Sequence, residues 1–194
     1  MARAIALTLA CVFAAASAHA ADAAKAQGHF DKALNHYREG DFESSLSFLS
    51  KALAEDKLAL EVYALRALVR ERTGDSLGLN ADVAQALRMQ PSRRPLSLVL
   101  RGQARRLAGD LESARKDFEL AIETDKEFAD AYFARGALAR REGDAKKALA
   151  EWVQALKLDP NLYIARHDLA WALYELGYPD RAVKQLTKAL RGNP

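Results

Sequence analysis

Small and apolar residues recur along most of the chain with a period of 34 or 35 residues. Five glycines mark the period: Gly40, Gly74, Gly109, Gly143 and Gly177. Nine residues after each glycine stands a large apolar residue: Leu49, Val83, Phe118, Trp152 and Leu186. Twelve residues after it stands Ala followed by Leu or Ile, and seven residues before it stands Ala or Gly. Each glycine is therefore followed by an apolar stripe at helical spacing.

These positions have clear physical roles in a pair of helices. Glycine supplies the left-handed residue that ends a first helix. Asp follows the glycine in four of the five periods, where it favours the start of a second helix. The small residue before the glycine lets two helices approach closely, and Pro91, Pro160 and Pro194 stop the second helix. The pattern predicts helical hairpins of about 34 residues in tandem.

This combination of positions resembles the tetratricopeptide repeat, in its period and in its small-residue, Gly-Asp, Ala and Pro positions. The resemblance covers residues 26–194 in five units: 26–59, 60–94, 95–128, 129–162 and 163–194. It implies an all-α fold, a right-handed α-solenoid of five helical hairpins. In this family the first helices of the units line the concave side, where a partner usually lies.

The first twenty residues differ from the rest of the chain. Arg3 is followed by an apolar run over 5–16, which is too short to span a bilayer, and then by a small-residue site ending at Ala20. This pattern is typical of a secretory signal peptide. We expect cleavage after Ala20, residues 21–25 as a lead-in, and a periplasmic or secreted protein with no membrane span. An uncleaved anchor or an ordinary first helix are the alternatives.

Composition narrows the class of protein further. Beyond residue 20 the chain has only eight Ile and Val residues, which argues against a β protein. Its only cysteine, Cys11, lies in the expected signal, so the mature chain has no thiol for a disulfide, a metal or a nucleophile. A net charge of +3 over 194 residues, with basic and acidic side chains interleaved, does not predict nucleic-acid binding.

Three units carry Arg eight residues before the glycine and an acid eight residues after it. The pairs are Arg66 with Asp82, Arg101 with Asp117, and Arg135 with Glu151. Because residues equidistant from the turn face each other in an antiparallel hairpin, we expect an ion pair within each of these hairpins. The alternative is that these arginines face an anionic ligand. The last unit has Leu169 and Gln185 at the same places.

The resemblance also suggests which residues line the concave groove. The candidates are Phe30, Leu34, Arg38, Leu68, Arg72, Val99, Gln103, Arg106, Phe133, Arg140, His167, Trp171 and Tyr174. They form an apolar track and a row of arginines, for which core packing and solvated helix ends are the alternatives. Together they imply a protein or peptide partner that is apolar with acidic groups. The Lys and Asn with which some family members hold a C-terminal carboxylate are absent from these places.

No sequence motif for catalysis is found. The chain has no phosphate-binding glycine loop, nucleophile elbow or zinc-protease motif. His29 and His36 lie two helical turns apart, which suits packing better than a shared metal ion. We therefore expect no enzyme activity, no catalytic residue, no metal and no cofactor.

The favoured function is a non-catalytic adaptor or scaffold that binds a protein segment in the groove, in the bacterial periplasm. The alternative is a structural or accessory subunit of a cell-envelope assembly (secretion, pilus or outer-membrane machinery) that uses its ends and convex face.

No extra polar helix follows the last unit, so Val183, Leu186 and Leu190 are expected to be partly uncovered. Docking on a partner, or homo-oligomerisation through this end, is a further hypothesis.

Overall fold

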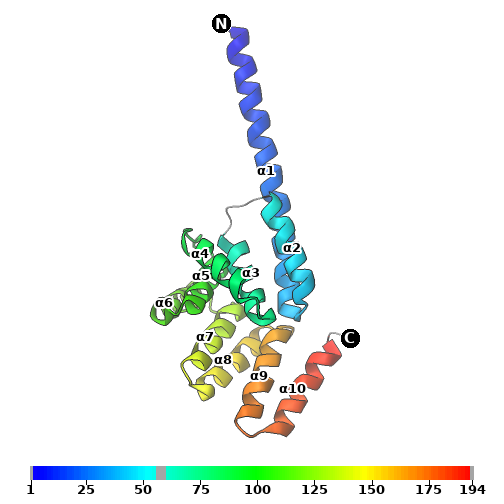
Figure 1. Ribbon diagram of the computed structural model, residues 1–194, viewed down its shortest axis with the longest axis vertical. Coiled ribbons are helices and arrows are strands. Elements are labelled where there is room, and N and C mark those ends of the chain that lie inside the picture. Colours follow the sequence, from blue (N-terminus) through cyan, green and yellow to red (C-terminus); the bar gives the residue numbers. More distant parts are fainter. Residues whose placement is uncertain (1, 56–59, 193–194) are drawn as a thin grey trace.

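The protein folds as a chain of helical hairpins (Figure 1). The computed structural model describes residues 2–55 and 60–192, and the side-chain surroundings of residues 20–55 and 60–188. Over these residues it contains ten helices and no strand: α1 (Ala2–Glu39), α2 (Phe42–Glu55), α3 (Leu60–Thr73), α4 (Ser76–Leu87), α5 (Pro95–Ala108), α6 (Leu111–Thr124), α7 (Ala129–Arg141), α8 (Ala145–Leu158), α9 (Tyr163–Glu175) and α10 (Pro179–Gly192). Five successive hairpins stack side by side, which confirms the predicted all-α solenoid.

Helix α1 is longer than the first helix of any other hairpin. It runs without a break from Ala2 to Glu39, so no change of structure marks the expected cleavage point after Ala20. Figure 1 shows its N-terminal part extending away from the solenoid. No helix over the described residues is both long and apolar enough to cross a membrane. Cleavage and export stay predictions.

Each hairpin turns at the glycine that marks its repeat. The five glycines have φ between +80° and +89°, the left-handed conformation expected at the end of a first helix. The following carboxylates cap the second helix, and Asp110 accepts a hydrogen bond from the backbone N–H of Ser113 at 3.1 Å. The small residue seven places earlier permits close packing, since a Cβ on Gly136 would overlap the Trp152 ring.

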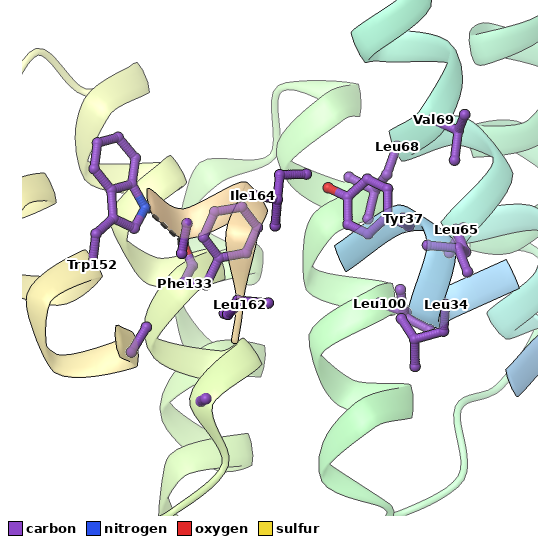
Figure 2. Close-up of a cluster of buried hydrophobic side chains, with 14 of the residues drawn as sticks. Leu34, Tyr37, Leu65, Leu68, Val69, Leu100, Phe133, Trp152, Leu162 and Ile164 are labelled. Atoms are coloured by element: carbon purple, nitrogen blue, oxygen red, sulfur yellow. Dashed lines mark hydrogen bonds between the residues drawn. The ribbon is translucent and has the colours of Figure 1, made fainter. Parts of the chain in front are cut away.

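The apolar stripe of α2, α4, α6 and α8 packs onto the first helices, whereas Leu186 at the same position of α10 is 40% exposed. Leu49, Phe118 and Trp152 are fully buried, as their repeated position predicts. The indole N–H of Trp152 donates to the backbone carbonyl of Phe133 at 3.2 Å, which satisfies the only polar atom of that side chain (Figure 2). The resulting core is shared between neighbouring hairpins, so no single unit can be stable by itself.

The three predicted ion pairs are confirmed. Arg66 Nε donates to Asp82 at 2.8 Å, Arg101 Nε to Asp117 at 2.9 Å, and Arg135 Nη2 to Glu151 at 2.9 Å. Two further contacts were not predicted. Arg70 and Arg105, one turn further along, also donate to Asp82 and Asp117, at 2.7 and 2.8 Å. In two units a buried carboxylate is thus bound by two arginines. These contacts favour the ion-pair interpretation over arginines that face an anionic ligand.

The coupling within such a pair is measurable. We expect Arg101→Ala to lower the free energy of unfolding by about 1–3 kcal/mol, because it removes two hydrogen bonds from a buried carboxylate. In an Asp117→Asn background the same change should cost less, since the buried charge is already gone. Urea denaturation of the four proteins of this double-mutant cycle measures the difference. Additive costs would contradict the pairing.

Candidate functional site

The concave side of the solenoid is closed by contacts between distant hairpins. Arg38 at the end of α1 is bound by Asp130 of α7, 92 residues away, with an Nε–Oδ1 distance of 3.1 Å. Arg72 at the end of α3 is bound by Asp168 of α9, 96 residues away, through two hydrogen bonds of 2.7 and 2.5 Å. Helix α1 also packs directly against α9. The first helices therefore face one another across the concave side.

This closure overturns the expected apolar track. Its first five members are buried in the core: Phe30, Leu34, Leu68, Val99 and Phe133. Figure 2 shows Leu34 and Leu68 in the same cluster as Ile164 of α9 and Phe133 of α7. Core packing, the alternative to a groove, therefore describes these five: Leu34, Leu68 and Phe133 share a cluster with Ile164 of α9, and Val99 is buried among residues of α5, α6 and α7. Only Trp171 of that track is open to solvent, with 49% of its surface exposed.

The predicted arginine row exists, but most of it is held in ion pairs. Arg106 is buried, binds Glu71 through hydrogen bonds of 3.0 and 2.7 Å, and donates to the side chain of the buried Gln103 at 2.6 Å. Arg140 is exposed and lies 3.3 Å from Glu175. The alternative interpretation, in which these arginines are solvated cations at helix ends, therefore does not apply to Arg38, Arg72 or Arg106. These three guanidinium groups hold the first helices together.

Burial and charge shift the titration of this polar cluster. Burial raises the pKa of Tyr37 to about 12, against the lowering effect of the nearby Arg72. Burial, the largest single effect, would lower the pKa of Arg72, but the hydrogen bonds with Asp168 together with the charges of Tyr37, Asp168 and Glu71 raise it above the ordinary value. Burial, the largest single effect, would raise the pKa of Asp168, but hydrogen bonds from Arg72 and His167 together with the charges of these two residues hold it below the ordinary value. Arg72 and Asp168 are therefore both charged at neutral pH.

An open recess lies beside this cluster. Its volume is about 370 Å³, and its charged lining comprises Arg72, Arg106, Arg140, Arg141, Glu71 and Asp168. Arg72 and Arg106 are paired with these two carboxylates and Arg140 with Glu175, so Arg141 gives the recess its excess positive charge. Arg141 is exposed and makes no ion pair within the described part of the chain. We call this site the arginine recess.

Exposed aromatic side chains continue from the recess along α9. His167 lies next to Asp168 in the sequence, with a ring nitrogen 3.2 Å from its carboxylate. Trp171 and Tyr174 follow at one-turn intervals and pack edge to face, with ring centroids 6.1 Å apart. All three rings are largely exposed. The structure thus keeps the last three groove candidates on one open surface, which we call the α9 face.

The histidines give no indication of a metal site. His29 and His36 both stack on the Phe48 ring, with centroid distances of 6.1 and 5.5 Å. Within the described residues, no group of three or more His, Cys, Asp or Glu side chains is arranged to hold a metal ion.

The sequence did not reveal the carboxylates that close the concave side. Asp130 and Asp168 each stand among apolar residues of a first helix, and Asp168 is buried. An acid in such a place signals a buried partner. No pattern at a separation of 92 or 96 residues identifies which arginine that partner is.

Comparisons with known proteins agree with the geometry. Tetratricopeptide repeat family models match residues 96–128 and 129–162. The human mitochondrial import receptor subunit TOM70 is 25% identical over 165 residues, which cover 83% of this chain, and the mouse protein is 24% identical over the same length. The chain spans only 27% of the length of these relatives.

A solved structure has a similar fold. The thermophilic TPR protein TTC0263 of Thermus thermophilus superimposes with a TM-score of 0.59 at 23% identity, covering 87% of this chain and 92% of that one. Tetratricopeptide repeats are thus identified over residues 96–162, within an all-α solenoid. Proteins built from this repeat generally mediate protein–protein interactions.

The closure can be tested through its most buried ion pair. Arg72→Met leaves the charge of Asp168, whose side chain is 3% exposed, without its guanidinium partner. We expect a loss of about 3–5 kcal/mol in the free energy of unfolding. Arg140→Met breaks an exposed pair near the end of α7, the first helix two repeats further on, and should cost less than about 1 kcal/mol. Guanidinium denaturation compares the two variants, and equal losses would contradict a special role for Arg72.

Proposed function

We propose that this protein is a non-catalytic scaffold that binds a protein or peptide segment at the arginine recess and the α9 face. The observation that carries the proposal is the adjacency of a positively charged recess and three exposed aromatic rings on one side of the solenoid. Among the described residues, the closed concave side leaves no continuous apolar groove. The proposed partner therefore lies on the arginine recess and the α9 face, and not along the whole concave side.

The chemistry of these residues defines the partner. Arg141 and Arg140 offer planar guanidinium groups at the rim, which bind carboxylates through paired hydrogen bonds. Trp171 and Tyr174 offer large apolar surfaces, and such side chains dominate binding energy in protein interfaces. The proposed partner segment therefore carries acidic groups beside at least one large apolar side chain.

A periplasmic or secreted location is part of the proposal. It is supported by the charged start, the apolar run over 5–16 and the small-residue site at Ala20. In that compartment a chain whose only cysteine is Cys11 would meet no risk of wrong disulfides after cleavage.

A second candidate function is a structural or accessory subunit of a cell-envelope assembly. The observation in its favour is the exposure of Val183 and Leu186 on α10, at the end of the solenoid. The side chain of Leu190, the third apolar residue expected there, lies outside the described residues. Contacts through this end, with another subunit or another copy of the chain, would not involve the arginine recess.

Paired substitutions separate the two functions. We expect Arg141→Ala with Trp171→Ala to reduce recovery of the partner by about tenfold or more, because both are exposed and supply its charged and apolar contacts. The measurement is quantitative mass spectrometry after cross-linking and affinity purification from the native envelope. The control is Leu120→Ala, an exposed apolar side chain on α6. Unchanged recovery with the double variant, together with loss for Leu186→Asp, would favour the second candidate.

A further inference from the structure

A second possible binding site lies on the outside of the solenoid, between the second helices of the last two units. This cleft has a volume of about 410 Å³, with α8 on one side, α10 on the other and α9 as its floor. The equivalent cleft one repeat earlier, between α6 and α8 over α7, has a volume of about 160 Å³. The two clefts occupy the same place in successive units, so their lining side chains can be compared position by position.

The smaller cleft is filled by ion pairs. Arg135 on its floor binds Glu151 at 2.9 Å, and Arg115 on its wall binds Glu142. The remaining charged residue on that wall is Glu119. Two ion pairs thus lie in the lining of this cleft, although the Nε atoms of Arg115 and Arg135 are buried without a hydrogen-bond partner among the described residues.

Thirty-four residues later, each of these charges is lost. Apolar residues replace four of them: Leu149 for Arg115, Val153 for Glu119, Leu169 for Arg135 and Leu176 for Glu142. Gln185 replaces Glu151, and its only described hydrogen bond is a long one of 3.5 Å from Arg166. The cleft between α8 and α10 is therefore open because the last unit lacks the arginine–acid pair of the units before it.

The walls and rim of this outer cleft have a single sign of charge. Leu149, Val153, Leu169 and Leu173 form its apolar surface, and Val153 has 41% of its surface exposed. The charged lining residues are Arg181, Lys184 and Lys188, with no carboxylate among the described residues that line it. None of the three cations makes an ion pair within the described part of the chain. An apolar floor with an uncompensated basic rim attracts an apolar ligand with negative charge.

We infer that the outer cleft is a docking site for an acidic amphipathic helix of a partner protein. Its apolar side chains would cover Val153 and Leu149, and its carboxylates would pair with Lys184 and Lys188 on the rim. The site shares no lining residue with the arginine recess, so the inference stands independently of the proposed function.

The repeat itself supplies the variant that tests this inference. Leu169→Arg with Gln185→Glu installs the pair that closes the cleft in the preceding unit, at a place where this fold already accepts it. The probe is a fluorescent amphipathic peptide with leucine on one helical face and glutamate on the other, titrated into the full chain. We expect the peptide to bind and the double variant to weaken binding by about tenfold or more.

Further variants and a control peptide identify the contacts and the occupant of the cleft. Lys184→Glu with Lys188→Glu should also weaken binding about tenfold, while Lys146→Glu, an exposed lysine on α8 outside the cleft, should leave it unchanged. A peptide with lysine in place of glutamate should not bind.

The inference would be overturned if the acidic peptide did not bind, or if both peptides bound equally. It would also be overturned if Leu169→Arg with Gln185→Glu left the affinity for the acidic peptide unchanged. Two other occupants of the cleft would also overturn the inference. A second copy of the chain would be detected as a dimer that Leu169→Arg with Gln185→Glu abolishes. Anionic lipid would be detected as vesicle binding that the same double variant abolishes. Arg141→Ala with Trp171→Ala should leave peptide binding at the outer cleft intact, which separates this test from that of the proposed function.

Discussion

The arginine–aspartate pairs across the concave side determine the shape of this solenoid. Stacking of neighbouring hairpins requires only local contacts, and by itself it leaves the curvature open to small adjustments in each repeat. Arg72 with Asp168, and Arg38 with Asp130, connect the first two hairpins to the last two. Buried ion pairs add little net stability compared with apolar packing, but loss of one partner leaves a costly buried charge. Their effect is to select one closed arrangement.

Closure of the concave side determines which residues stay exposed for binding. Side chains that would line an open groove, such as Phe30 and Phe133, become part of the core. The surface that stays available on the concave side is the arginine recess with the α9 face. On the outside, the fourth unit carries the Arg135–Glu151 pair at the place where the last unit presents an apolar cleft with a basic rim.

Local features of the fold were predictable from the sequence because each depends on residues within one repeat. The left-handed turn at Gly109, the cap by Asp110 and the pair of Arg101 with Asp117 all lie within about one hairpin. The candidate site was less predictable, because the burial of Leu34 and Leu68 depends on where α1 and α3 meet α9. His167, Trp171 and Tyr174 do lie on an open surface, and their role in binding a partner stays a prediction.

The closed arrangement can be measured directly as a distance between the ends of the solenoid. With Cys11→Ser, spin labels at Asn35 on α1 and Asp180 on α10, both exposed, report the separation of the first and last hairpins by pulsed electron resonance. We predict one narrow distance distribution that becomes broader and longer when Arg38→Met and Arg72→Met are combined. A broad distribution in the otherwise unchanged chain, insensitive to both substitutions, would contradict the closure.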